Sequence, residues 1–132
     1  RGAPGGLDYK TAMWRDDEQD PFHTVVGYWL WDAATGEVMR GFVVPRGITV
    51  LAGGTTTADT TEFTRTASVQ VGPYRIGENK YLADNASTVR YRSTITLNGD
   101  DTWRYDEETT LVMKEIAGEF AHTDSNTLRR VG

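Results

Sequence analysis

The chain has 132 residues, no cysteine and a formal net charge of −5. This length suits one domain, residues 1–132, with a flexible glycine-rich start over residues 1–6. The lack of cysteine excludes thiolate catalysis, thiolate metal sites and iron–sulfur clusters. The largest basic cluster is Arg129-Arg130, and no apolar run approaches ~18 residues, so neither nucleic-acid binding nor a membrane span is expected. The default expectation is a cytoplasmic protein.

Strand patterns dominate the first half, where Thr, Val, Tyr and Trp recur in short runs between Gly, Asn and Asp. A turn at residues 33–36 predicts a hairpin, and Gly53-Gly54 ends the strand that follows it. The strands expected here are 7–14, 23–32, 37–45 and 47–51.

Residues 25–31 (VVGYWLW) are apolar on both faces of the expected strand. A barrel interior accounts for one face, and a thick sandwich core accounts for it equally well. The other face needs a cover, which we expect to be a loop, an upstream segment or another chain.

The second half contains the clearest hairpin, in which strands 87–97 and 102–113 flank an Asn98-Gly99 turn. Alternation along 87–97 is expected to place Val89, Tyr91, Ser93, Ile95 and Leu97 on one face. Thr88, Arg90, Arg92, Thr94 and Thr96 are expected on the other face. Further strands are expected at 62–71 and 119–131, and a helical turn at 81–84.

Consecutive antiparallel strands of this kind form a sandwich or an up-and-down barrel. Long strands and hairpin-sized links favour the barrel, so we predict an all-β antiparallel barrel. Seven or so strands are too few for a roomy closed barrel, and the missing strands are expected before Arg1.

The two histidines, His23 and His122, are the candidate metal ligands. They cannot form a three-histidine zinc site, so any bound metal needs most of its ligands from elsewhere. Haem meets this condition, because the porphyrin fills four coordination positions of the iron. The protein then needs to supply only one neutral imidazole. A structural role is the commoner fate of a lone histidine. Trp29 is an aromatic that can stack on a flat ligand, although most buried tryptophans are simply core.

Acidic runs at 16–18, 100–101 and 106–108 are interpreted as solvated turns, and no carboxylate pair indicates a hydrolase. A carrier of a fatty acid would instead need an arginine inside the barrel. Arg90 or Arg92 would supply it if the facing of their strand were reversed.

Residues 21–29 (PFHTVVGYW) resemble a segment of the nitrobindin family, and residues 44–54 (VPRGITVLAGG) resemble its following strand–glycine–strand segment. Residues 7–14 fall where the family has an earlier strand, and residues 127–131 (TLRRV) are similar to its terminal strand. The resemblance implies a ten-stranded barrel, similar to fatty-acid-binding proteins and lipocalins, whose first strands lie before Arg1. It also implies ferric haem b and chemistry on nitric oxide and peroxynitrite, including a peroxynitrite isomerase-type activity.

Carried over by position, the resemblance makes His23 a pocket residue, with Phe22 where the family has methionine. His122 becomes the axial iron ligand. However, counting back from Val131 aligns the family's histidine with Thr123. His122 therefore needs a bulge in the last strand to face the pocket, because a one-residue slip reverses the facing of a strand.

Three functions follow from the sequence. The first is a haem-binding barrel in which His122, His23, Phe22 and Trp29 form the site. The second is a non-catalytic carrier of a fatty acid or a similar apolar molecule. The third is a structural or interaction domain with a filled interior, paired with a copy of itself as a homodimer.

Overall fold

The computed structural model describes residues 5–13, 23–57, 59–68 and 73–131 of the chain, with residues 5, 13, 23 and 63–68 described by their backbone alone. The described part forms nine strands and one helix. In chain order they are β1 (Gly5–Met13), β2 (His23–Asp32), β3 (Glu37–Val44), β4 (Ile48–Thr55), β5 (Glu62–Ser68), β6 (Ile76–Glu78), α1 (Lys80–Asn85), β7 (Ala86–Leu97), β8 (Thr102–Met113) and β9 (Glu119–Arg129).

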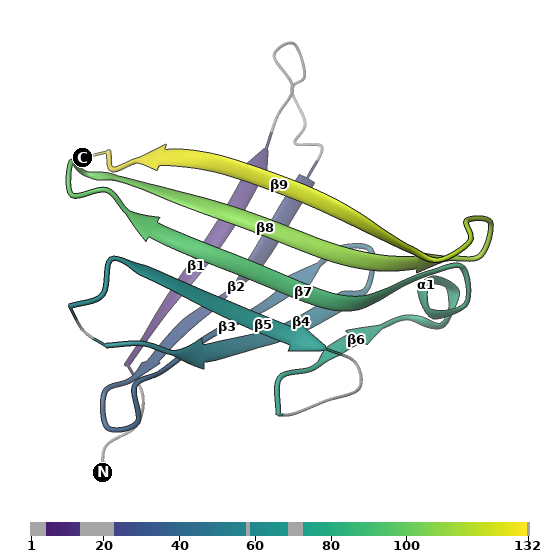
Figure 1. Ribbon diagram of the computed structural model, residues 1–132, viewed down its shortest axis with the longest axis horizontal. Coiled ribbons are helices and arrows are strands. Elements are labelled where there is room, and N and C mark those ends of the chain that lie inside the picture. Colours follow the sequence, from purple (N-terminus) through teal and green to yellow (C-terminus); the bar gives the residue numbers. More distant parts are fainter. Residues whose placement is uncertain (1–4, 14–22, 58, 69–72, 132) are drawn as a thin grey trace.

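All strand pairs are antiparallel and belong to one sheet with the order β1-β2-β3-β4-β5-β7-β8-β9, while β6 pairs with β4. The sheet curls, so that β7, β8 and β9 pass in front of β1 and β2 at a steep angle (Figure 1). The expected all-β, up-and-down arrangement is therefore confirmed. Within the described residues β1 and β9 remain separate edges of the sheet, so the barrel is not closed by a strand ladder.

Two predicted strands agree with the structure residue for residue, whereas β4 continues through Gly53-Gly54, where its end was predicted. The bounds of β2 and β8 are as predicted, and the helical turn expected at 81–84 is part of α1. Asn79 caps this helix, since its Oδ1 accepts a hydrogen bond from the backbone N–H of Leu82 at 2.9 Å. Strand β6 was not predicted, and residues 14 and 69–71 of two predicted strands lie outside the described residues.

A β-bulge in β7 sets which of its residues face inward. Thr88 pairs with Leu111 and Arg90 pairs with Thr110, so Val89 is the extra residue. Thr88 is consequently buried, which corrects the expectation that it shares the outer face with Arg90. From Tyr91 to Ile95 the predicted alternation holds, with Tyr91, Ser93 and Ile95 buried, but Leu97, also predicted to face inward, is 47% exposed.

Glu78 holds this bulge in place. Its carboxylate accepts hydrogen bonds from Ser87 Oγ and from the backbone N–H of Thr88, at 3.1 and 3.2 Å to its two oxygens. Replacing Glu78 with alanine leaves a buried N–H without its acceptor, and we expect a loss of about 2 kcal/mol in the free energy of unfolding. Urea unfolding measures this loss, with Glu108→Ala on exposed β8 surface as the control. Equal stabilities for the two variants would contradict it.

The core lies on the inner side of β4 and β7. Val50, Ala52, Ile76 and Tyr91 form it, with Phe42, Ile48 and Tyr74 packed against it. Tyr74 lies over Gly53, where an added Cβ would come within 2.1 Å of the Tyr74 ring, and its hydroxyl donates to Glu37. Only glycine at position 53 leaves room for this ring.

Burial raises the pKa of Tyr74 to about 12, and its hydrogen bond to Glu37 and the charge of that carboxylate add to the effect. The unfolded chain loses the tyrosine proton near pH 10, whereas the folded chain holds it to about pH 12. Stability from this site is therefore present below pH 10 and lost as the pH rises towards 12. We expect Tyr74→Phe to remove this part of the alkaline fall in the urea midpoint; an identical fall in both proteins would contradict it.

Candidate functional site

An inner cavity of about 530 Å³ lies on the concave side of the curled sheet. Its volume is within the range of sites for small molecules and cofactors. Residues from strands β2, β3, β4, β7, β8 and β9 and from helix α1 line it. The apolar lining residues are Val25, Phe42, Val44, Ile48, Val50, Leu82, Ala86, Leu111, Met113 and Phe120.

His122 lines this cavity from β9. The β8–β9 ladder runs without a register shift from Thr102↔Arg129 to Val112↔Glu119, and it places His122 directly opposite Thr109. Residues opposite each other in an antiparallel pair share a face, and Thr109 also lines the cavity. The bulge that counting back from Val131 made a condition for His122 to face the pocket is absent from the β8–β9 ladder. It is not needed, because the pairing with β8 turns the even-numbered residues of β9 inward.

The other predicted site residues are placed less fully. His23 begins β2 opposite Met13, but its side chain and all of Phe22 lie outside the described residues. Trp29 is half-buried on β2 and packs beside the cavity, with its ring centroid 6.5 Å from that of Tyr9 and 5.8 Å from Arg40 Cζ. The structure thus brings Trp29 next to an arginine that sequence reasoning did not single out.

Arg40 is the centre of a polar cluster at one end of the cavity, which we call the Arg40 cluster: Arg40, Tyr9, Tyr91 and Glu107. Arg40 Nε donates to Tyr9 Oη at 2.6 Å, and Nη1 donates to Tyr91 Oη at 2.8 Å and to Glu107 Oε1 at 2.5 Å. Tyr91 Oη also donates to Glu107 Oε1 at 2.8 Å. Because β3 is a neighbour of neither β7 nor β8 in the sheet, this cluster connects its two halves across the interior.

Burial alone lowers the pKa of the Arg40 guanidinium, but the charges of Tyr91, Glu107 and Tyr9 outweigh it and leave that pKa above its ordinary value. Only 12% of the Arg40 side chain and 23% of the Glu107 side chain are exposed. The guanidinium therefore stays a cation, paired with one carboxylate in a mostly enclosed position.

Two interpretations of the sequence are corrected by this cluster. The run 106–108 is not a solvated turn, since it lies within β8, where Glu107 faces the cavity. Alternation with Thr109 and Leu111 was the signal that would have placed Glu107 inside. Among the described residues two arginines line the cavity, the enclosed Arg40 and the exposed Arg46. Arg90 and Arg92 are exposed outside it, as their strand's alternation predicted.

The opposite end of the cavity is formed by α1 and the β3–β4 turn, which carries Arg46. Asn79 Nδ2 donates to the carbonyl of Arg46 at 2.7 Å, and the Asn79 N–H donates to the carbonyl of Gly47 at 3.0 Å. The helix cap and the turn are thereby held together, and this end of the cavity has a fixed frame.

Asp124 adds a carboxylate to the lining two residues beyond His122 and directly opposite Glu107. The Tyr105 hydroxyl donates a hydrogen bond to Asp124 Oδ2 at 3.3 Å. Burial raises the pKa of Tyr105, and the negative charge of Asp124 raises it further. The tyrosine therefore remains a neutral donor to this carboxylate.

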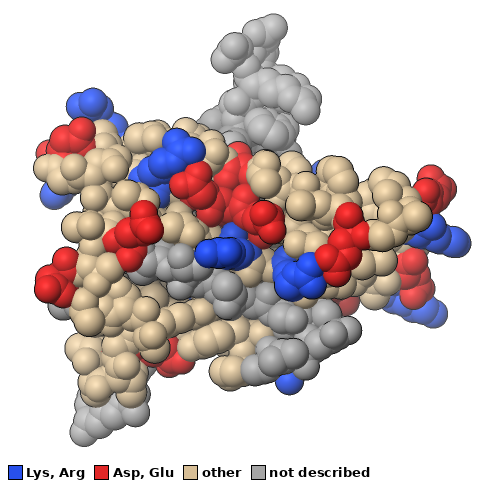
Figure 2. All heavy atoms as spheres, in the orientation of Figure 1, with Lys and Arg blue, Asp and Glu red and all other residues tan. Residues whose placement is uncertain are grey.

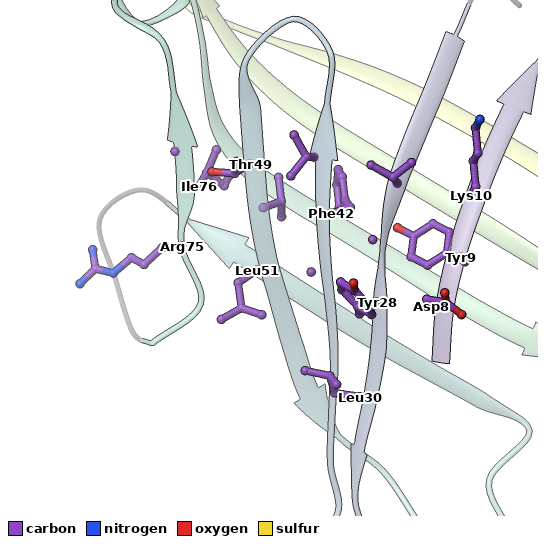
Figure 3. A pocket seen from close by; sticks show the side chains of 16 residues that line it. Asp8, Tyr9, Lys10, Tyr28, Leu30, Phe42, Thr49, Leu51, Arg75 and Ile76 are labelled. Carbon is purple, nitrogen blue, oxygen red and sulfur yellow. The ribbon is translucent and has the colours of Figure 1, made fainter. Parts of the chain in front are cut away.

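A second hollow, of about 1080 Å³, opens on the outer face of β2, β3 and β4. Its exposed apolar side chains include Val26, Tyr28, Val43 and Leu51. Figure 3 shows Lys10 on the β1 side of this hollow and Arg75 on the β6 side. The apolar character predicted for both faces of β2 thus has a structural counterpart. Covering of this face by a second copy of the chain stays a prediction, which sedimentation of the purified protein would test.

Charged side chains of both signs are interspersed over the face formed by β7, β8 and β9 (Figure 2). Arg90 pairs with Glu119 and Arg104 pairs with Asp106, the latter at 2.9 Å. In the part of the chain that the structure describes, no three His, Cys, Asp or Glu side chains are arranged to hold a metal ion, and no helix is long and apolar enough to cross a membrane.

Comparison with family models matches residues 4–130 to the family described as "THAP4-like, heme-binding beta-barrel domain". The match covers nearly the whole chain. No curated protein and no solved structure gives a significant match.

Proposed function

We propose, from the premise that this chain belongs to the THAP4-like haem-binding β-barrel domain family, that its inner cavity holds ferric haem b with His122 as the protein ligand to iron. The family assignment agrees with the resemblance to nitrobindin drawn from residues 7–14, 21–29, 44–54 and 127–131. The observation that carries the proposal is the position of His122, an imidazole on the wall of a largely apolar cavity.

The residues present fit such a group. A planar macrocycle needs apolar walls, and Val25, Phe42, Leu111 and Phe120 provide them from four strands. Iron in a porphyrin needs one axial donor from the protein, and a neutral imidazole is a common one. His122 is solvent-exposed on the edge strand β9, so a flat cofactor can reach it from the open side of the sheet.

Ferric haem bound in this way would supply an open iron position to small nitrogen oxides, and we propose the reaction with nitric oxide and the isomerisation of peroxynitrite to nitrate as its chemistry. The chain itself would bind the haem and provide its surroundings. His122 would hold the iron, apolar side chains such as Val25 and Leu111 would limit water, and the Arg40 cluster keeps one end of the cavity polar.

Titration of the purified protein with hemin tests the proposal. A saturable shift and sharpening of the hemin Soret band is expected for the wild type, because an imidazole would bind the iron and apolar side chains would replace water around the porphyrin. Leu111 lines the cavity, whereas its neighbour Val112 is 43% exposed on the other face of β8. Leu111→Trp should therefore block this shift, and Val112→Trp should keep it.

Equal Soret shifts for Leu111→Trp and Val112→Trp would place the haem elsewhere and contradict the proposal. If the wild type binds hemin in the cavity, stopped-flow mixing with peroxynitrite and measurement of the nitrate yield test the chemistry separately. A nitrate yield no higher than in the buffer control would reject the isomerase activity and leave haem binding intact.

A further inference from the structure

The guanidinium of Arg40 has donors to spare inside the cavity. An arginine carries five N–H donors, and the bonds from Nε and Nη1 to Tyr9, Tyr91 and Glu107 account for three of them. Among the described residues, no hydrogen bond leaves Nη2. Since Arg40 lines the inner cavity, its remaining donors are available to a ligand there.

Aromatic rings around Arg40 strengthen the hydrogen bonds that its remaining donors can make. Its Cζ lies 4.7 Å from the centroid of the Phe42 ring, 5.0 Å from that of Tyr9 and 5.8 Å from that of Trp29. Aromatic rings on several sides replace water around the cation, and a charge-assisted hydrogen bond is stronger where water is scarce.

Between Arg40 and the end formed by α1, the cavity offers apolar wall. Phe42 and Val44 continue inward along β3 from Arg40, and Leu111 and Met113 do so along β8 from Glu107. Small inorganic anions would leave this wall uncovered. A molecule with one polar head and an apolar chain covers both parts at once.

We propose that the inner cavity binds an apolar molecule that carries one carboxylate, of the fatty-acid class, with the carboxylate on Arg40 and the chain along β3 and β8 towards α1. This goes beyond haem binding, because it needs neither iron nor His122. Arg40 thus takes the role that the sequence offered to Arg90 or Arg92.

Glu107 is the competitor of such a ligand. It already pairs with Arg40, so a second carboxylate on the same guanidinium experiences repulsion from the first. The ligand's affinity for the wild type is therefore held down by Glu107. Removing its charge while keeping its shape should strengthen carboxylate binding. A purely structural role for Arg40 gives the opposite expectation, because loss of the Glu107 charge would then only loosen the cluster.

Calorimetric titration with decanoate and with decan-1-ol tests this inference, because the two probes share a chain and differ in the charge of the head. For the wild type we expect decanoate to bind roughly tenfold more tightly than the alcohol, the effect of about one charge-assisted hydrogen bond. Glu107→Gln should tighten decanoate binding several-fold and leave decan-1-ol unchanged. Arg92→Met, on the outer face, should change neither affinity.

The double variant Arg40→Met/Glu107→Gln leaves no unpaired charge and should lose the preference for decanoate. Wild-type protein that binds both probes equally, or neither, overturns the inference without any variant. Weaker decanoate binding by folded Glu107→Gln also overturns it. His122→Ala separates this inference from the haem proposal, because it should abolish the Soret shift while decanoate binding persists; loss of decanoate binding in that variant counts against the placement at Arg40.

Discussion

His122→Ala is expected to abolish the shift and sharpening of the hemin Soret band at hemin concentrations that saturate the wild type, with a fall in haem affinity on the order of 100-fold or more. Loss of residues that only orient a metal ligand already costs about 10–100-fold, and loss of the ligand itself should cost at least as much. His122 is exposed and belongs to the edge strand β9, so alanine there should leave the fold intact. Far-ultraviolet circular dichroism checks the fold in the same samples.

Thr123→Ala is the matched control, because Thr123 follows His122 and points to the other side of β9. We expect this variant to bind hemin like the wild type. If Thr123→Ala lost the Soret shift and His122→Ala kept it, the register of β9 against β8 would be wrong by one residue. His122 would then be rejected as the ligand to iron.

Arg40→Met is expected to lower the free energy of unfolding by about 3 kcal/mol, because it leaves the enclosed carboxylate of Glu107 without its cation. The same substitution breaks the link between β3 and the β7–β8 half of the sheet. Urea unfolding followed by circular dichroism measures the loss, and it avoids Trp29 fluorescence, which the change beside that ring would alter.

Two further variants separate the effect of the Arg40–Glu107 ion pair from the effects of its individual side chains. Arg40→Met/Glu107→Leu should recover most of the stability, because apolar groups of similar size often replace an enclosed ion pair without cost. Arg104→Met breaks an ion pair on the exposed surface of β8 and should change the urea midpoint little. A double variant as unstable as Arg40→Met would show that Arg40 contributes mainly through its ring contacts.

Alternation was enough to predict the strands whose two faces differ in chemistry. Tyr91, Ser93 and Ile95 were placed inward, and Arg90 and Arg92 outward, from the pattern of residues alone. The three residues of β6 carry too short a pattern to be recognised, and their strand exists because β4 offers a partner over Ile48–Val50.

The errors arose where one strand's geometry depends on another. Thr88 turned inward because Glu78, ten residues away, holds a bulge at Val89. His122 faces the cavity because β8 fixes the register of β9, which counting along the chain from Val131 could not reproduce.

The sequence by itself determined an antiparallel β fold and the hairpins around Gly36 and Gly99, because alternation and turn residues depend only on neighbouring positions. It also determined the family to which residues 4–130 belong. Only the tertiary structure decided which polar side chains meet in the lining of the cavity. Arg40 and Glu107 are 67 residues apart, and no local pattern records that they meet across the curled sheet. Their pairing follows from the burial of both side chains on one concave face, which exists only once all the strands have assembled.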